Sequence, residues 1–196
     1  MALVVSGATG WLVSTEVGQQ ALLEQQVSAM ESFGVSVSDE IYAQLESRLE
    51  SAMYFTAGSV LVFLPIMTLI LAGAIWSVCY VLLGAYAPFR AMYAVVVHVG
   101  AVNIVQQLFV IPLNYTRGAM NNPTTLAAFF PMLETGSFAQ RLLSVIDLFI
   151  VWQLTVLAIG VAVLYGKRTG PFASTFFALY AVIAVGAAFF FTRLGG

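Results

Sequence analysis

The residues of this chain that could do chemistry are a few polar side chains within long apolar stretches. They are His98, Asn103, Gln106, Gln107, Asp147 and Gln153. Polar and ionisable groups are costly inside a bilayer, so those found there are functional candidates by default. Two uses fit this set: a relay of ions or protons through Asp147 and His98, or hydrogen bonds that hold neighbouring helices together.

Helix geometry predicts which of these side chains can meet. At a rise of about 1.5 Å per residue, Asp147 lies at the depth of the three amides of the preceding antiparallel helix. These amides occupy one arc of that helix, so they can face the carboxylate together. We therefore expect a polar seam around Asp147, with Gln153 nearer His98 and with Arg117 and Arg141 reaching in from the interface.

We favour the interhelical use of this seam over a relay. Relays and transporters usually place several acids or bases at depth, whereas here Asp147 and His98 are the ionisable groups of the seam. Hydrogen bonds between membrane helices contribute about 1 kcal/mol each.

Long stretches of sequence without a charged residue indicate the helices that carry these side chains. Of the 196 residues, 61% are hydrophobic and 8% are charged. Four stretches carry no charge at all: 51–89, 91–116, 148–166 and 169–192. A bilayer core takes about 20 apolar residues of helix, and these runs lack the alternation of barrel strands. The sequence predicts an all-α fold, a polytopic bundle of transmembrane helices.

The transmembrane domain is predicted at 54–196. Its full spans are expected at about 60–83, 91–113, 138–165 and 172–191, the third beginning at a capping box of Ser137 and Gln140. A short interfacial helix is expected at about 123–133, with Asn122 as its cap and Pro123 at its first position. Residues 1–13 are apolar but too few to cross, so we interpret them as the end of a short or truncated first span.

Residues 14–53 are predicted to form an acidic extramembrane helical hairpin. Residues 1–53 hold seven acids against Arg48, whereas 54–196 hold six bases against two acids. Ser14 or Thr15 can cap its first helix, Gly34 can end it, and the second helix should begin at Ser38 and run on into the next span.

Arg90, Lys167 and Arg168 lie in short turns between spans. Basic short loops mark the cytoplasmic side, so the hairpin and the C-terminus should be periplasmic or lumenal. We expect a multi-pass protein of a membrane, the bacterial inner membrane in the first place.

Metal and enzyme signatures are not found in the sequence. Cys79 and His98 are each the single residue of their type, which disfavours a cysteine- or histidine-based metal site. Catalytic and phosphate-binding motifs are also missing. We expect a protein that is not an enzyme, with no catalytic residue, no cofactor, no metal and no nucleic-acid partner.

The second half of the chain carries several ordered motifs. They are Leu113-Asn114-Tyr115-x-Arg117-Gly118, Pro131-Met132-Leu133-Glu134-x-Gly136-Ser137-Phe138, Ile146-Asp147-Leu148-Phe149-x-x-Trp152 and Leu157-Ala158-Ile159-Gly160. With these motifs, residues 55–190 resemble bacterial members of the Yip-one family of five-span membrane proteins. The resemblance implies a cytoplasmic N-terminus and interface roles for Arg117, Arg141 and Trp152.

The resemblance also implies a kind of function. Eukaryotic members associate with prenylated Rab-type small GTPases in vesicle trafficking, and some bacterial members resemble accessory proteins of ABC exporters. Our leading hypothesis is a scaffold or accessory subunit that binds other integral membrane proteins and lipids, as a homo- or hetero-oligomer. The alternative is a small transporter or ion-conducting protein built on Asp147, Gln106, Gln107 and His98.

Overall fold

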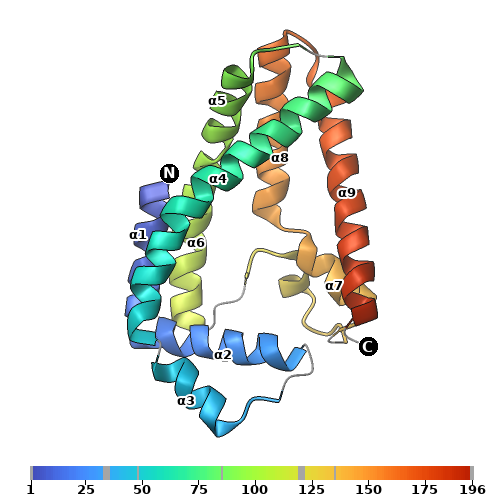
Figure 1. Cartoon of the computed structure of the whole chain (residues 1–196). Helices are drawn as coiled ribbons and strands as arrows, with labels where there is room; N and C mark the ends of the chain where they lie inside the picture. Colours follow the sequence, from blue (N-terminus) through green and yellow to red (C-terminus); the bar gives the residue numbers. More distant parts are fainter. Residues whose placement is uncertain are drawn as a thin grey trace.

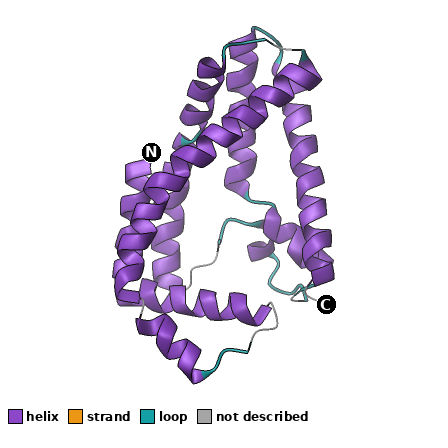
Figure 2. Cartoon of the chain, in the orientation of Figure 1, coloured by secondary structure: helices purple, strands orange, loops and turns teal. Residues whose placement is uncertain are grey.

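A computed structural model describes residues 2–32, 36–47, 49–84, 86–118, 122–134 and 136–194. Across these ranges the chain is helical with no strand, apart from one isolated bridge between Thr125 and Asp147 (Figures 1 and 2). The elements are α1 (Ala2–Ser14), α2 (Glu16–Ser32), α3 (Asp39–Ser47), α4 (Leu49–Leu83), α5 (Phe89–Val99), α6 (Ala101–Arg117), η1 (Leu126–Phe129), α7 (Phe138–Val145), α8 (Leu148–Tyr165) and α9 (Thr169–Leu194). The predicted all-α class is confirmed.

Within these ranges, four helical segments are long and apolar enough to cross a membrane. They are Gly58–Leu83, Phe89–Arg117, Leu148–Tyr165 and Thr169–Arg193. The second joins α5 and α6 through Gly100, whose φ of −58° keeps the backbone helical. The polytopic helical bundle predicted from the charge-free stretches is therefore present.

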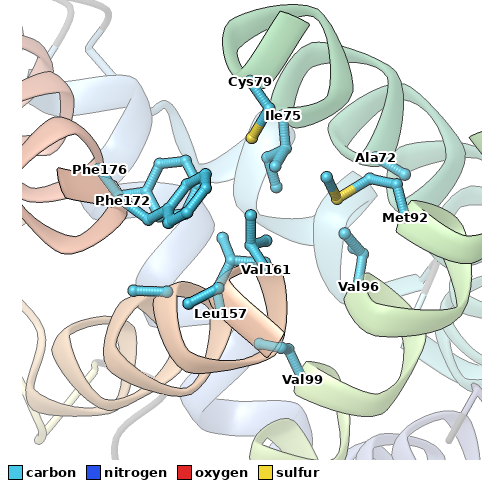
Figure 3. Packing of buried hydrophobic residues seen from close by; sticks show 12 residues of the cluster. Ala72, Ile75, Cys79, Met92, Val96, Val99, Leu157, Val161, Phe172 and Phe176 are labelled. Atoms are coloured by element: carbon cyan, nitrogen blue, oxygen red, sulfur yellow. The ribbon is translucent and has the colours of Figure 1, made fainter. Parts of the chain in front are cut away.

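The core of the bundle lies where α4, α5, α8 and α9 meet (Figure 3). Its most buried members include Cys79, Met92, Val161 and Phe172, all exposed by 1% or less. Close packing of α5 on α8 depends on Gly160, because a Cβ there would lie 2.8 Å from a methyl group of Val95. Small residues at such contacts let two helices approach closely.

The two ends of the bundle carry opposite charge. The turns before α5 and between α8 and α9 lie at one end, whereas α2, α3, η1, α7 and the C-terminal end of α9 lie at the other (Figure 1). The bases of the short turns are therefore separated from the acids of the hairpin, as the sequence predicted. The aromatic side chains of Trp76, Tyr80 and Tyr86 cluster at the basic end, typical of a membrane interface.

Helix α1 packs along α4 and α6, and a sharp corner separates it from α2 (Figure 1). Thr15 shapes the corner: its hydroxyl donates to the Leu12 carbonyl at 2.7 Å and accepts from the Gly18 N–H at 3.1 Å. A Cβ at Gly18 would lie 1.9 Å from the Leu12 oxygen, so only glycine fits. The predicted cap at Thr15 is confirmed.

The remaining hairpin predictions have mixed outcomes. Helix α3 begins after Ser38, whose hydroxyl oxygen accepts from the Ile41 N–H at 3.5 Å. The structure describes α3 up to Ser47 and α4 from Leu49, so the junction through which this helix is expected to run on into the span falls outside the described residues. The stop predicted at Gly34 lies outside the described residues.

Two predicted elements are wrong in extent. The span expected at 138–165 is broken into α7 and α8, because Ile146 and Asp147 have extended backbones. The interfacial helix expected at 123–133 is the single turn η1, and its N-cap is Thr125 instead of Asn122. The physical reason is shared: backbone groups of residues 124 and 126 pair with residues 146 and 148, so neither segment can continue as a helix.

Candidate functional site

The candidate site is the break between α7 and α8, where a loop crosses the chain. The Leu126 N–H donates to the Ile146 carbonyl at 2.8 Å, and the Leu148 N–H donates to the Thr124 carbonyl at 3.1 Å. These two bonds replace helical bonds that the break removes. Non-helical backbone at membrane depth is tolerated where such groups are satisfied by protein.

Asp147 stands at the centre of this break and is 1% exposed. Its Oδ1 accepts from the backbone N–H groups of Phe149 at 2.7 Å and Ile150 at 3.3 Å, which caps α8. Its Oδ2 accepts from the Asn122 amide at 2.7 Å and the Thr124 hydroxyl at 2.5 Å. Four donors thus surround one carboxylate, and its negative charge lies at the favourable N-terminal end of the α8 dipole.

Tyr180 of α9 closes the break from the other side. Its hydroxyl donates to the Val145 carbonyl at 2.8 Å and accepts from the Asp147 N–H at 3.2 Å. The last carbonyl of α7 and the N–H of Asp147 are thereby satisfied by one side chain. Helices α7, α8 and α9 and the loop before η1 are fixed to one another at a single point.

The polar seam predicted around Asp147 is divided in the structure. Gln153 donates to Asn103 across α6 and α8 at 2.9 Å, instead of lying with His98. His98 is exposed on α5, with its Nδ1 2.7 Å from the Ala94 carbonyl oxygen. The depth count failed because it assumed an unbroken helix through Asp147.

Gln106 and Gln107, the other expected partners of Asp147, line a separate pocket of about 270 Å³. Its lining comes from α1, α6 and the following loop: Thr9, Leu12, Gln106, Gln107, Val110, Ile111, Asn114 and Asn122. The Oδ1 atom of Asn114 is buried and has no hydrogen-bond partner among the described residues. Asn122 lines this pocket and also bonds Asp147, so it links the two parts of the predicted seam.

The two arginines expected near Asp147 lie elsewhere. Arg141 donates through Nε to the Gly136 carbonyl at 2.9 Å and through a terminal nitrogen to the Phe191 carbonyl, which fastens α7 to α9. Arg117 lies at the end of an apolar groove of about 560 Å³ between α6, α8 and the loop around η1. Trp152, the third residue expected at an interface, lines the same groove and is 45% exposed.

A further apolar cavity of about 570 Å³ opens inside the bundle, bordered by α4, α5, α6, α8 and α9. Asn103, Gln153 and Tyr180 supply polar groups to its wall, and Thr68 faces it from α4. The side-chain amides of Asn103 and Gln153 bond each other, so α6 and α8 are joined beside the cavity by a direct hydrogen bond between side chains.

Sequence reasoning missed the roles of Asn122, Thr124 and Tyr180. One signal was available for Asp147 itself: an aspartate directly before a long apolar run is a helix N-cap pattern. For Thr124 and Tyr180, the contacts join residues 23 and 33 positions from Asp147, and no local pattern marks them.

Comparisons with protein-family models, curated proteins and solved structures found no match for this chain. Within the described residues, no group of three or more His, Cys, Asp or Glu side chains could hold a metal ion. Membership of the Yip-one family therefore stays a prediction from the sequence motifs.

Proposed function

We propose that this integral membrane protein is a non-enzymatic scaffold or accessory subunit that associates with other membrane proteins. The observation that carries the proposal is the saturated environment of Asp147, whose carboxylate accepts four hydrogen bonds from the protein itself. A buried acid used in this way holds helices and a loop together. Its oxygens are already occupied by protein donors, which suits a structural role better than ion transfer.

The acidic hairpin offers a surface for the partner. All six acids of α2 and α3 are exposed: Glu16, Glu24, Glu31, Asp39, Glu40 and Glu46. They lie at the end of the bundle opposite the basic turns (Figure 1). We infer that a basic segment of a neighbouring membrane protein binds here, because complementary charge sets orientation and association rate.

A matched pair of charge variants tests this function. One variant replaces Glu24, Glu31 and Glu40 with glutamine, and the control replaces the same three residues with aspartate, which keeps their charge. Each is purified from native membranes in a gentle detergent, and co-purified proteins are identified by mass spectrometry. We expect a stoichiometric membrane partner with the wild type and the control, lost in the hairpin variant and at high salt. Recovery of wild type as a monodisperse monomer would contradict the proposal.

Transport is the second candidate, and the amide-lined pocket beside Asn122 is the observation that favours it. Ion flux into proteoliposomes, compared between wild type and Asp147→Asn, separates the two. If the wild type supports an ion flux and the folded Asp147→Asn variant does not, the transporter proposal would replace the scaffold proposal. The scaffold proposal expects no flux above that of protein-free liposomes for either protein.

A further inference from the structure

The apolar groove that ends at Arg117 has the features of a lipid site. Its α6 wall consists of four residues at a spacing of four: Val105, Phe109, Leu113 and Arg117. Such a spacing forms one ridge along a helix. The opposite wall includes Leu148, Phe149 and Trp152 of α8, and Ala128 and Phe129 cover the end near η1.

The dimensions of the groove match one leaflet. From Val105 to Arg117 the helix rises by about 18 Å, and half of a bilayer core is about 15 Å. The volume of about 560 Å³ lies within the usual range of ligand pockets, roughly 300–1,000 Å³. An acyl chain that lies along the α6 ridge therefore brings its headgroup to the level of Arg117.

The charge at the groove selects the headgroup. Arg117 is the single charged residue of the lining, it is exposed, and it makes no hydrogen bond or ion pair with the described part of the chain. Arg141, by contrast, is committed to two carbonyls. A guanidinium binds phosphate oxygens through paired hydrogen bonds.

We propose that this groove binds one anionic phospholipid, with an acyl chain between α6 and α8 and its phosphate on Arg117. Arg117 is the last residue of α6, and this end of α6 lies on the side of α2 and α3 (Figure 1), so the site belongs to the leaflet on the side of the acidic hairpin. It is independent of the proposed protein partner, because its recognition elements are on α6, α8 and the η1 loop instead of α2 and α3.

Tryptophan quenching tests the site in the full chain. Trp11 and Trp76 are changed to phenylalanine, which leaves Trp152, a residue of the groove, as the single tryptophan, and its emission is excited selectively at about 295 nm, where tyrosine absorbs little. The protein is placed in phosphatidylcholine vesicles that contain brominated phosphatidylglycerol or, at equal fraction, brominated phosphatidylcholine. We expect the anionic lipid to quench with about fivefold higher apparent affinity, which corresponds to about 1 kcal/mol for one arginine.

Four variants decide the outcome. Arg117→Gln should reduce the preference to about onefold, whereas Arg193→Gln, at the same end of the bundle but outside the groove, should keep it. Ala128→Phe should also lower the preference, since it fills the groove and leaves Arg117 in place. Equal quenching by both lipids in the wild type, or a preference unchanged in Arg117→Gln or in Ala128→Phe, would overturn the proposal. Gel filtration of each variant shows that it is folded, and Arg117→Lys, which keeps the charge, should retain part of the preference.

Discussion

The side-chain amide of Asn122 donates to Oδ2 of Asp147 over 2.7 Å, so a loop residue holds the carboxylate that begins α8. The other carboxylate oxygen caps that helix. One acid therefore sets both where α8 starts and where the loop before η1 lies. A break of this kind brings together chain segments that a continuous helix would keep apart.

The first prediction concerns Thr124, which is 2% exposed and donates to Asp147 at 2.5 Å. Thr124→Val keeps the shape of the side chain but removes one donor from a buried carboxylate. We expect a loss of about 1–3 kcal/mol in the free energy of unfolding, measured by reversible unfolding in mixed micelles.

Thr155→Val is the matched control for that change. Thr155 is exposed on α8, and among the described residues its hydroxyl donates only to the Val151 carbonyl of its own helix. Its replacement should alter stability by less than about 0.5 kcal/mol. If both valine variants lose the same stability, the hydrogen bonds around Asp147 do not hold the break together.

The second prediction concerns the amide pair between α6 and α8. Asn103 takes part in a further interaction besides its bond to Gln153. The change in unfolding free energy on replacing Asn103 alone therefore includes more than the energy of the Asn103–Gln153 bond. A double-mutant cycle with Asn103→Leu and Gln153→Leu isolates it. We expect a coupling energy of about 0.6 kcal/mol and at most about 1.7 kcal/mol, typical of hydrogen bonds between membrane helices.

A coupling energy of zero in this cycle would mean that the two amides meet without stabilising the bundle. The Thr155→Val variant, crossed with Gln153→Leu, gives the background for non-bonded residues on α8. The measurement is the same unfolding experiment, so the values can be compared directly.

The spans could be predicted from the sequence, whereas the break at Asp147 could not. Charge-free length and hydropathy are local properties, and they located the segments that begin near residues 58, 89 and 169. The α7–α8 break depends on Thr124 and Tyr180, which reach Asp147 only after the chain has folded. The prediction of one polar seam failed for the same reason. The depth of Asp147 relative to Gln106 was counted along one continuous helix, whereas α7 ends at Val145 and α8 begins at Leu148.

The third prediction concerns the corner between α1 and α2. Gly18→Ala places a methyl group against the Leu12 carbonyl, a backbone atom that cannot move aside without shifting α1. We expect a loss of about 1–3 kcal/mol or more, seen as a lower unfolding midpoint and faster proteolysis of the hairpin.

Gly7→Ala is the control for the corner, because Gly7 lies within α1 and a Cβ there meets nothing within 4 Å. It should leave stability unchanged or raise it by about 0.5–1 kcal/mol, since alanine favours a helix over glycine. Equal midpoints for the two alanine variants would contradict the tight approach at Gly18.

The fourth prediction concerns orientation in the membrane. In a Cys79→Ala background, one cysteine replaces Glu40 of the hairpin and another replaces Lys167 of the turn between α8 and α9. Both native residues are exposed, and the elements that carry them, α3 and the turn between α8 and α9, lie at opposite ends of the bundle (Figure 1). Because basic short turns face the cytoplasm, a membrane-impermeant maleimide added to intact cells should label Glu40→Cys, and should label Lys167→Cys only after lysis.

The reverse labelling pattern would contradict the charge rule for this protein but would leave the arrangement of the bundle unchanged. Labelling of both positions from outside would contradict the bundle itself, since it would place the acidic hairpin and the basic turn on the same side of the membrane.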